Sequence, residues 1–194
     1  MTTFVLATAN EHKVEEIRAV LTPLGVQLLD RPTGVAEVDE TGTTLEENAL
    51  LKARALVAAT GRAAIADDTG LFVDALNGRP GVHSARYAGE SASYDDNVTK
   101  LLEELSDVPA PRTARFVTVI AAAYPDGASF CVEGELEGVI VDARLGDQGF
   151  GYDPVFVPDD GIGRTLAQLS AREKNDLSHR GRALRALSEE LARR

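Results

Sequence analysis

The 194-residue chain has the composition of an ordinary globular protein, with 44% hydrophobic and 26% charged residues. No stretch reaches the roughly 18 apolar residues that a membrane-spanning helix needs, and the opening segment lacks the basic leader of a secretory signal. A formal net charge of −11 argues against nucleic acid as a partner, because binding a polyanion requires a basic face. We therefore expect a single cytoplasmic domain over residues 1–194 that binds neither membrane nor nucleic acid.

The first half of the chain alternates between strand and helix patterns. The segment TFVLAT is predicted to be a buried strand, and Asn10 caps a helix that Gly25 closes. Residues 27–30 are interpreted as a second strand, and a longer helix runs from its cap Thr44 to Gly61. The segment AAIADD then predicts an apolar strand that ends in two carboxylates.

The second half begins with a loop rich in Gly, Pro and Asn at residues 75–90, which is too long for a simple connector. Ser93 starts a helix through Leu105, and the strands that follow are joined at a Pro-Asp-Gly turn. A glycine-rich loop at residues 145–154 precedes a last helix from about Ser178. Early strand–helix alternation and a late meander predict an α/β protein with a mixed sheet.

Two lysines stand where folding alone gives little reason for a positive charge. Lys13 lies in the first turn of its helix, where a cation opposes the helix dipole, so a bound anion would resolve the conflict. Thr8, Ala9 and Asn10 would then form the loop that approaches this anion. Lys52 falls within the apolar stripe of the second long helix, where it either reaches a charged ligand or extends to solvent.

Three acidic residues are candidates for binding a divalent cation. Carboxylates at the carboxyl end of a buried strand often bind metal, and Asp67 and Asp68 occupy that place in AAIADD. Neighbouring side chains of a strand point to opposite faces, so the two need not bind one ion together. We interpret Asp68 as metal ligand and proton acceptor, Asp67 as its support, and Glu40 as a second ligand. Solvated acids remain the alternative.

The run FGYDP places aromatic residues in the glycine-rich loop. A nucleotide base could stack on Phe150, an interaction that contributes about 1–3 kcal/mol, although the aromatics could equally fill the core. Lys174, His179 and Arg180 follow in a C-terminal segment where positive residues outnumber negative ones, which suits an anionic ligand.

Taken together, five segments resemble the inosine triphosphate pyrophosphatase family, which hydrolyses ITP, dITP and XTP to the monophosphate and pyrophosphate and so cleanses the nucleotide pool. The segments are LATANEHK, ETGTTLEENALLKA, ADDTGLFVDALNGRPGVHSARYAG, FGYDPVF and EKNDLSHRGRAL, in the family's order and at its spacing. One departure is Ala9, where the family commonly has glycine, the residue that best tolerates positive φ.

The resemblance implies an elongated two-lobed α/β fold with a long mixed sheet, an active-site cleft between the lobes, and a homodimer. It implies Mg²⁺ as cofactor, bound by Glu40 and Asp68, with Asp68 as proton acceptor. Asp67, Lys13 and Lys52 complete the implied catalytic set. The implied substrate contacts are Thr8, Ala9, Asn10, Glu11, His12, Lys13, Thr69, Phe150, Gly151, Tyr152, Asp153, Lys174, His179 and Arg180.

The implied reaction is in-line attack on the α-phosphorus by a water that Asp68 deprotonates, with pyrophosphate leaving beside Mg²⁺ and Lys13. A phosphatase with an aspartyl nucleophile would need acids spaced as DxD, whereas here they are adjacent. A regulatory nucleotide-binding module would keep the same contacts, so product formation alone separates the two. No GxxxxGK segment occurs, which excludes a P-loop NTPase.

Overall fold

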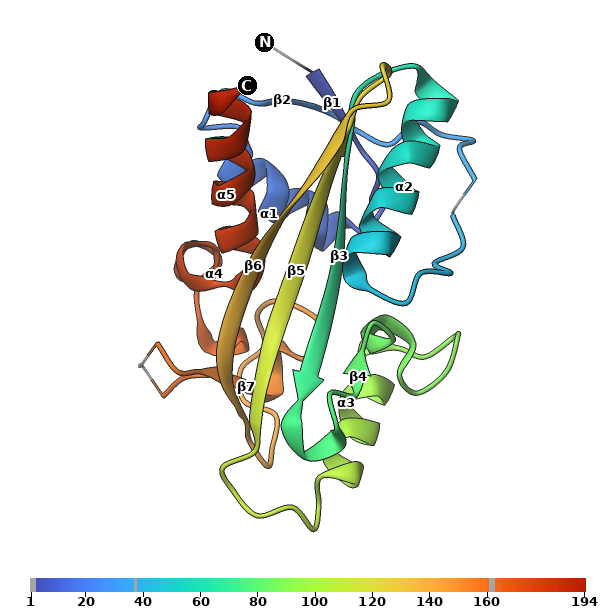
Figure 1. Ribbon diagram of the computed structural model, residues 1–194. Helices are drawn as coiled ribbons and strands as arrows, with labels where there is room; N and C mark the ends of the chain where they lie inside the picture. Colours follow the sequence, from blue (N-terminus) through green and yellow to red (C-terminus); the bar gives the residue numbers. More distant parts are fainter. Residues whose placement is uncertain (1–2, 37, 161–162) are drawn as a thin grey trace. The chain divides into compact units, whose positions relative to one another are not determined.

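The computed structural model describes residues 3–36, 38–160 and 163–194 as a mixed α/β fold (Figure 1). Within these residues, seven strands form one sheet in the order β2-β1-β3-β5-β6-β7, with β4 paired to β3. The β1 strand is parallel to β2 and β3, whereas the β3–β4 and β6–β7 pairs are antiparallel, so the predicted mixed sheet is confirmed. The elements are β1 (Thr3–Leu6), α1 (Glu11–Leu21), β2 (Gln27–Leu29), α2 (Leu45–Thr60), β3 (Ala64–Val73), β4 (Pro80–Gly81), α3 (Tyr94–Glu104), β5 (Thr113–Ala123), β6 (Ser129–Ile140), β7 (Phe156–Pro158), α4 (Ala171–Leu177) and α5 (His179–Arg193).

The chain divides into two compact units, each assembled from separate stretches of sequence. Unit 1 contains Met1–Asp68, Thr118–Gly134 and Arg180–Arg194, and unit 2 contains Thr69–Val117 and Glu135–His179. One boundary falls inside β3, directly after its two aspartates. The single domain expected over residues 1–194 stays a prediction.

Helices cover both faces of the sheet in unit 1. Figure 1 shows α2 on the opposite side of the strands from α1 and α5. The Asn10 side chain accepts a hydrogen bond from the backbone N–H of Lys13 at 3.3 Å, which fixes the start of α1 as predicted. That helix ends earlier than predicted, at Leu21, because Pro23 has no backbone N–H to continue the hydrogen-bond ladder beyond Thr22. The core on the α1 and α5 side contains Phe4, Leu6, Ile17, Leu21, Ala63, Ile65, Ile120, Ala122, Ala183, Leu184 and Leu187.

The length of β3 differs most from the sequence prediction. We expected the strand to end at its two carboxylates, whereas it continues to Val73 and holds Asp67 and Asp68 in its interior. Apolar residues after them sustain the strand, and both carboxylates have positively charged partners, without which buried acids are rarely tolerated. The prediction of a strand end at this point was therefore wrong.

In unit 2, α3 and the 3-10 turns of the loops pack on the strands. Ser93 starts α3 with a capping box, as its position predicted. The C-terminal segment forms two helices, α4 and α5, because Ser178 between them has extended backbone, and the predicted start near Ser178 belongs to α5. The core contains Leu71, Val73, Leu76, Tyr87, Val98, Leu101, Leu105, Ala114, Phe116, Leu136, Ile140, Tyr152, Val155, Phe156, Leu166 and Leu169.

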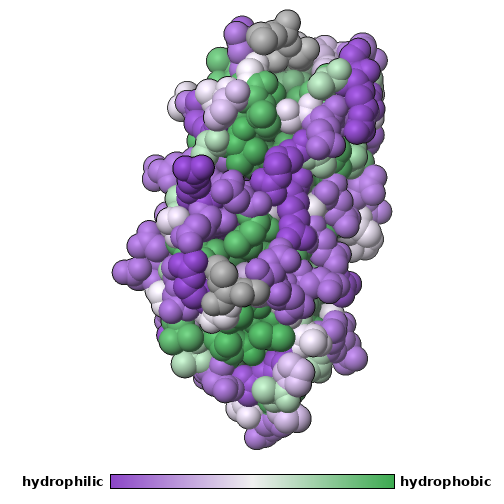
Figure 2. All heavy atoms as spheres, turned by 90° about the vertical axis from the view of Figure 1, so that its left-hand side faces the viewer, coloured by the Kyte–Doolittle hydropathy of each residue, from purple (hydrophilic) through white to green (hydrophobic). Residues whose placement is uncertain are grey.

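The face shown in Figure 2, on the side of α5, is largely hydrophilic. Along α5, Ala183, Leu184 and Leu187 are buried, whereas Glu189 and Arg193 are exposed and form an ion pair at 3.6 Å. No helix in the described part of the chain is long and apolar enough to cross a bilayer.

Candidate active site

A first charged network in unit 1 joins α2, β3 and the segment before α2. The Lys52 ammonium lies 2.8 Å from Asp68 Oδ1 and 2.7 Å from Glu40 Oε1. Asn48, one turn before this lysine, donates from Nδ2 to Asp68 Oδ2 at 3.4 Å and accepts from the Gly42 N–H at 2.8 Å. Lys52 therefore occupies a position in the apolar stripe of its helix because its ammonium neutralises two carboxylates.

Burial has opposite effects on the two central groups of this network. Burial raises the pKa of Asp68, and Glu40 raises it further, against the opposing effect of Lys52. Burial alone would lower the pKa of Lys52, but the neighbouring carboxylates of Asp68, Asp67 and Glu40 outweigh it and raise that pKa. The lysine therefore stays charged, while Asp68 accepts a proton more readily than an ordinary aspartate.

A second network, also in unit 1, alternates negative and positive groups. Asp67 Oδ2 lies 3.0 Å from the Lys13 ammonium and 3.3 Å from both Nε and Nη2 of Arg180. On its other side, Arg180 Nη1 donates to Glu16 Oε2 at 2.6 Å. Burial would raise the pKa of Asp67, but Lys13 and Arg180 hold it well below its usual range. Asp67 therefore remains ionised at any physiological pH.

The carboxylates supply oxygen atoms of the kind that divalent cations prefer as ligands. Glu40 and Asp68 each place an oxygen beside the same ammonium, so one positive centre already lies between them. Asp67 Oδ1 is buried and has no hydrogen-bond partner among the described residues. In that part of the chain, no group of three or more His, Cys, Asp or Glu side chains is arranged to hold a metal by itself. A cation would therefore complete its coordination with water and ligand oxygens, as Mg²⁺ commonly does.

The N-terminus of α1 supplies the predicted phosphate loop. The Asn10 N–H donates to Thr8 Oγ1 at 3.1 Å, which folds the loop back on itself. Ala9, Glu11 and His12 are exposed at this helix end, where backbone N–H groups favour an anion.

Arg31, which the sequence did not indicate, braces the strand before this loop. Its guanidinium donates to the carbonyl oxygens of Ala7 at 2.5 Å, Val35 at 3.2 Å and Ala36 at 2.7 Å. Because Ala7 directly precedes the predicted phosphate loop, Arg31 fixes the end of the chain segment that carries it.

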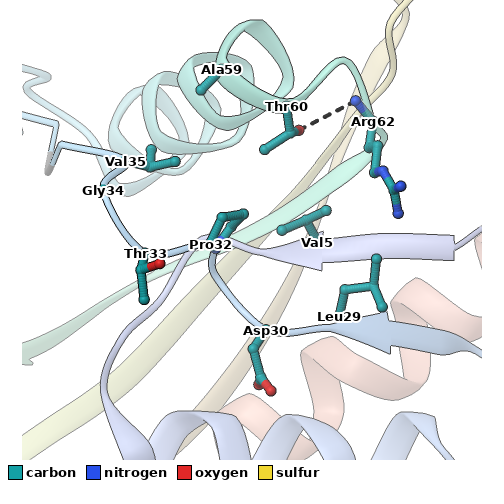
Figure 3. A pocket seen from close by; sticks show the side chains of 10 residues that line it. All are labelled: Val5, Leu29, Asp30, Pro32, Thr33, Gly34, Val35, Ala59, Thr60 and Arg62. Atoms are coloured by element: carbon teal, nitrogen blue, oxygen red, sulfur yellow. Dashed lines mark hydrogen bonds between the residues drawn. The ribbon is translucent and has the colours of Figure 1, made fainter.

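Two cavities flank the loop at residues 30–35. One of about 640 Å³ is bounded by this loop and by Thr8, Ala9 and Glu11, so the predicted phosphate loop borders open space. The other, of about 460 Å³, lies between the same loop, β1 and the end of α2 (Figure 3). None of the predicted site residues is among the described residues that line the second cavity.

In unit 2, the loop with Phe150 is held by Asp153 and Lys174. Asp153 Oδ2 accepts from the Phe150 N–H at 2.8 Å and from the Lys174 ammonium at 2.5 Å. The ammonium also lies 4.6 Å from the centre of the Phe150 ring. Gly149 has φ +73°, and a Cβ there would collide with the Asp153 carboxylate, so only glycine fits.

Tyr152 and His179 are buried within unit 2. The Tyr152 hydroxyl donates to the Ser84 carbonyl oxygen at 2.9 Å, and His179 stacks on Phe116 with ring centres 4.4 Å apart. Both side chains therefore pack in the core of unit 2. For Tyr152 this agrees with the alternative interpretation of FGYDP, in which its aromatic residues fill the core. Thr69 and Gly151 are half-buried, and the substrate contacts of all four residues stay predictions.

Arg180 follows His179 in sequence but belongs to unit 1, where its guanidinium bonds Asp67 and Glu16. Glu16 is a site residue that the sequence motifs did not indicate. Its place one turn after Lys13 on α1 was a usable signal, since residues three apart share a helix face.

The fold and these groups define a class of protein that can bind a phosphorylated ligand together with a divalent cation. The model of the Ham1 family matches residues 4–190, and the chain belongs to that family. It is 53% identical over 196 residues to the dITP/XTP pyrophosphatase of Nitratidesulfovibrio vulgaris, covering 96% of this chain and 94% of that protein. It is 50% identical over 188 residues to the dITP/XTP pyrophosphatase of Symbiobacterium thermophilum, covering 96% and 93%. A solved HAM1 protein from Coxiella burnetii is 40% identical and superposes with a TM-score of 0.91 over 100% of both chains.

Proposed function

We propose that this protein hydrolyses the non-standard purine nucleoside triphosphates dITP, ITP and XTP to the monophosphate and pyrophosphate, which removes them before incorporation into DNA and RNA. The names of its relatives, which match almost the whole chain, support this activity. The observation that carries it is the Glu40–Lys52–Asp68 network, in which two carboxylates share one positive centre.

Mg²⁺ is the proposed cofactor, with Glu40 and Asp68 as its protein ligands. When bound, it neutralises phosphate charge and polarises the phosphorus–oxygen bonds. The proposed role of Lys13, at the N-terminus of α1, is to add a positive charge for the departing phosphates. Lys52 balances the two carboxylates, which would otherwise repel one another.

Asp68 is the proposed proton acceptor for the attacking water. The hydrogen bond from Asn48 to its Oδ2 orients the carboxylate for this role. Asp67, whose pKa is lowered, is a poor base, and its proposed role is to hold Lys13 in place. The two neighbouring acids thus take different roles because their partners differ.

Recognition of the base is proposed for the loop around Phe150. The base would stack beside the Phe150 ring, in a loop whose backbone Asp153 holds and where Lys174 adds a positive charge. Backbone groups from Phe150 to Asp153 would read the base edge.

We further propose that the chain acts as one domain in a homodimer in the cytoplasm, as the family resemblance implies. Light scattering would then give twice the 20.6 kDa chain mass.

A panel of nucleoside triphosphates, assayed separately for pyrophosphate and orthophosphate, tests the proposed activity. We expect pyrophosphate from ITP, dITP and XTP and none after EDTA treatment. Orthophosphate with a diphosphate left behind would contradict the activity, and binding without turnover would instead indicate a regulatory module.

A further inference from the structure

Tyr94 is a large side chain that the core of unit 2 does not require. It is 41% exposed and occupies the first position of α3. The capping box fixes that position, because the Asp96 N–H donates to Ser93 Oγ at 3.1 Å and the Ser93 N–H donates to Asp96 Oδ2 at 2.8 Å. The backbone therefore sets where this ring stands, and burial of the ring contributes little to stability.

The Tyr94 ring lies against the Phe150 ring. The two centroids are 5.8 Å apart and the planes are tilted by 42°, within the range of favourable aromatic pairs. Because both residues belong to unit 2, this contact is internal to one compact body.

Arg144 ties the same loop to the helix that carries Tyr94. Its Nε lies 2.9 Å from Asp95 Oδ1, and its Nη2 donates to Thr99 Oγ1 at 2.6 Å and to the Asp95 carbonyl oxygen at 3.1 Å. Arg144, just before the loop of residues 145–154, is thus anchored to α3 next to Tyr94. These bonds, together with the contact between the rings, keep Tyr94 and Phe150 side by side.

A single phenyl ring is smaller than a purine, and the Lys174 ammonium already lies over the Phe150 ring. We propose that Tyr94 is a second aromatic contact for the base, which extends the Phe150 surface and favours a purine over a pyrimidine. This inference rests on the proposed function and adds a specificity-determining residue to it. Neither the family motifs nor the charged networks include this position.

Binding of IMP, the monophosphate product, tests the inference without turnover. Base stacking on an aromatic residue contributes about 1–3 kcal/mol, so Tyr94→Ala should weaken IMP binding about 5-fold to 140-fold. Tyr94→Phe keeps the ring and should bind IMP as the original protein does. Binding of CMP, whose base is smaller, should change less in Tyr94→Ala. Leu24→Ala is the control, since Leu24 is another exposed large apolar side chain, at 52%, and lies outside all the proposed substrate contacts.

Fluorescence separates direct contact from mere support of Phe150. The chain has four tyrosines and no tryptophan, so tyrosine emission can be followed directly. IMP should quench the original protein, and Tyr94→Phe should lose most of that quench at unchanged affinity. Unchanged IMP affinity in Tyr94→Ala, equal losses for IMP and CMP, or an undiminished quench in Tyr94→Phe would each overturn the inference. Failure of the proposed function would be seen separately, as the wrong product from ITP.

Discussion

Replacing Arg180 with leucine removes the positive partner of two carboxylates inside unit 1. Arg180 and Asp67 are only 2% and 3% exposed, and the guanidinium bonds Asp67 on one side and Glu16 on the other. Removing one member of a buried ion pair costs about 3–5 kcal/mol. In this variant Glu16 loses its bond to Arg180, whereas Asp67 keeps Lys13 at 3.0 Å. For a chain of this size, each kcal/mol lowers Tm by about 2–4 °C, so we expect a fall of about 6–20 °C.

Two further variants isolate the cause of that loss. Arg193→Leu also removes an arginine from α5, but Arg193 is 69% exposed, and a surface pair of this kind contributes at most about 1 kcal/mol. Adding Glu16→Gln to Arg180→Leu removes the charge of the carboxylate that Arg180 Nη1 paired with and should restore part of the stability. Urea unfolding followed by circular dichroism measures all three. Equal stability of Arg180→Leu and Arg193→Leu would refute the argument.

The same variant also bears on specificity. Because the guanidinium contacts Asp67 and Glu16, activity should fall alike for ITP and GTP. A loss confined to ITP would instead favour the substrate contact that the family resemblance implies for Arg180.

Three other predictions concern the reaction itself. Asp68→Asn should keep the fold but lower kcat by at least about 10²–10⁴, since a positioned base typically contributes that much; a kcat above about a tenth of the original would rule out its role. Gly149→Ala should raise KM for ITP more than it lowers kcat, because the added Cβ displaces the Asp153 carboxylate that holds the loop; unchanged kinetics would show that the loop tolerates the shift. ITP and XTP should exceed ATP and GTP in kcat/KM by about 10² or more, since two buried donors left unpaired by ATP cost about 1–3 kcal/mol each and the 2-amino group of GTP clashes or stays unpaired in a tight pocket; equal values for ITP and GTP would contradict base-edge reading.

Local chemistry made much of this fold predictable. The caps Asn10, Thr44 and Ser93 start their helices where the sequence indicated, because each satisfies backbone N–H groups within its own first turn. The start of α4 could have been found in the same way, since Ser170 and Glu173 form a capping box.

Contacts between distant residues set the limit of sequence prediction. The β3 strand passes through two aspartates because Lys13 and Lys52, from two different helices, neutralise them, and no local pattern records that pairing. Likewise Arg180 meets Glu16 across 164 residues of sequence. The motifs thus indicated the candidate residues Lys13, Lys52 and Arg180. Which carboxylate each of them pairs with became visible only in the folded chain.

Hydrolysis of ITP in ¹⁸O-labelled water tests the central claim most directly. Attack of water on the α-phosphorus places the water oxygen in IMP and leaves pyrophosphate unlabelled, whereas attack on the β-phosphorus labels pyrophosphate. We predict that mass spectrometry will find the label in IMP alone, in a reaction that stops when EDTA removes the cation. Label in pyrophosphate, or in orthophosphate released beside IDP, would contradict the proposed reaction.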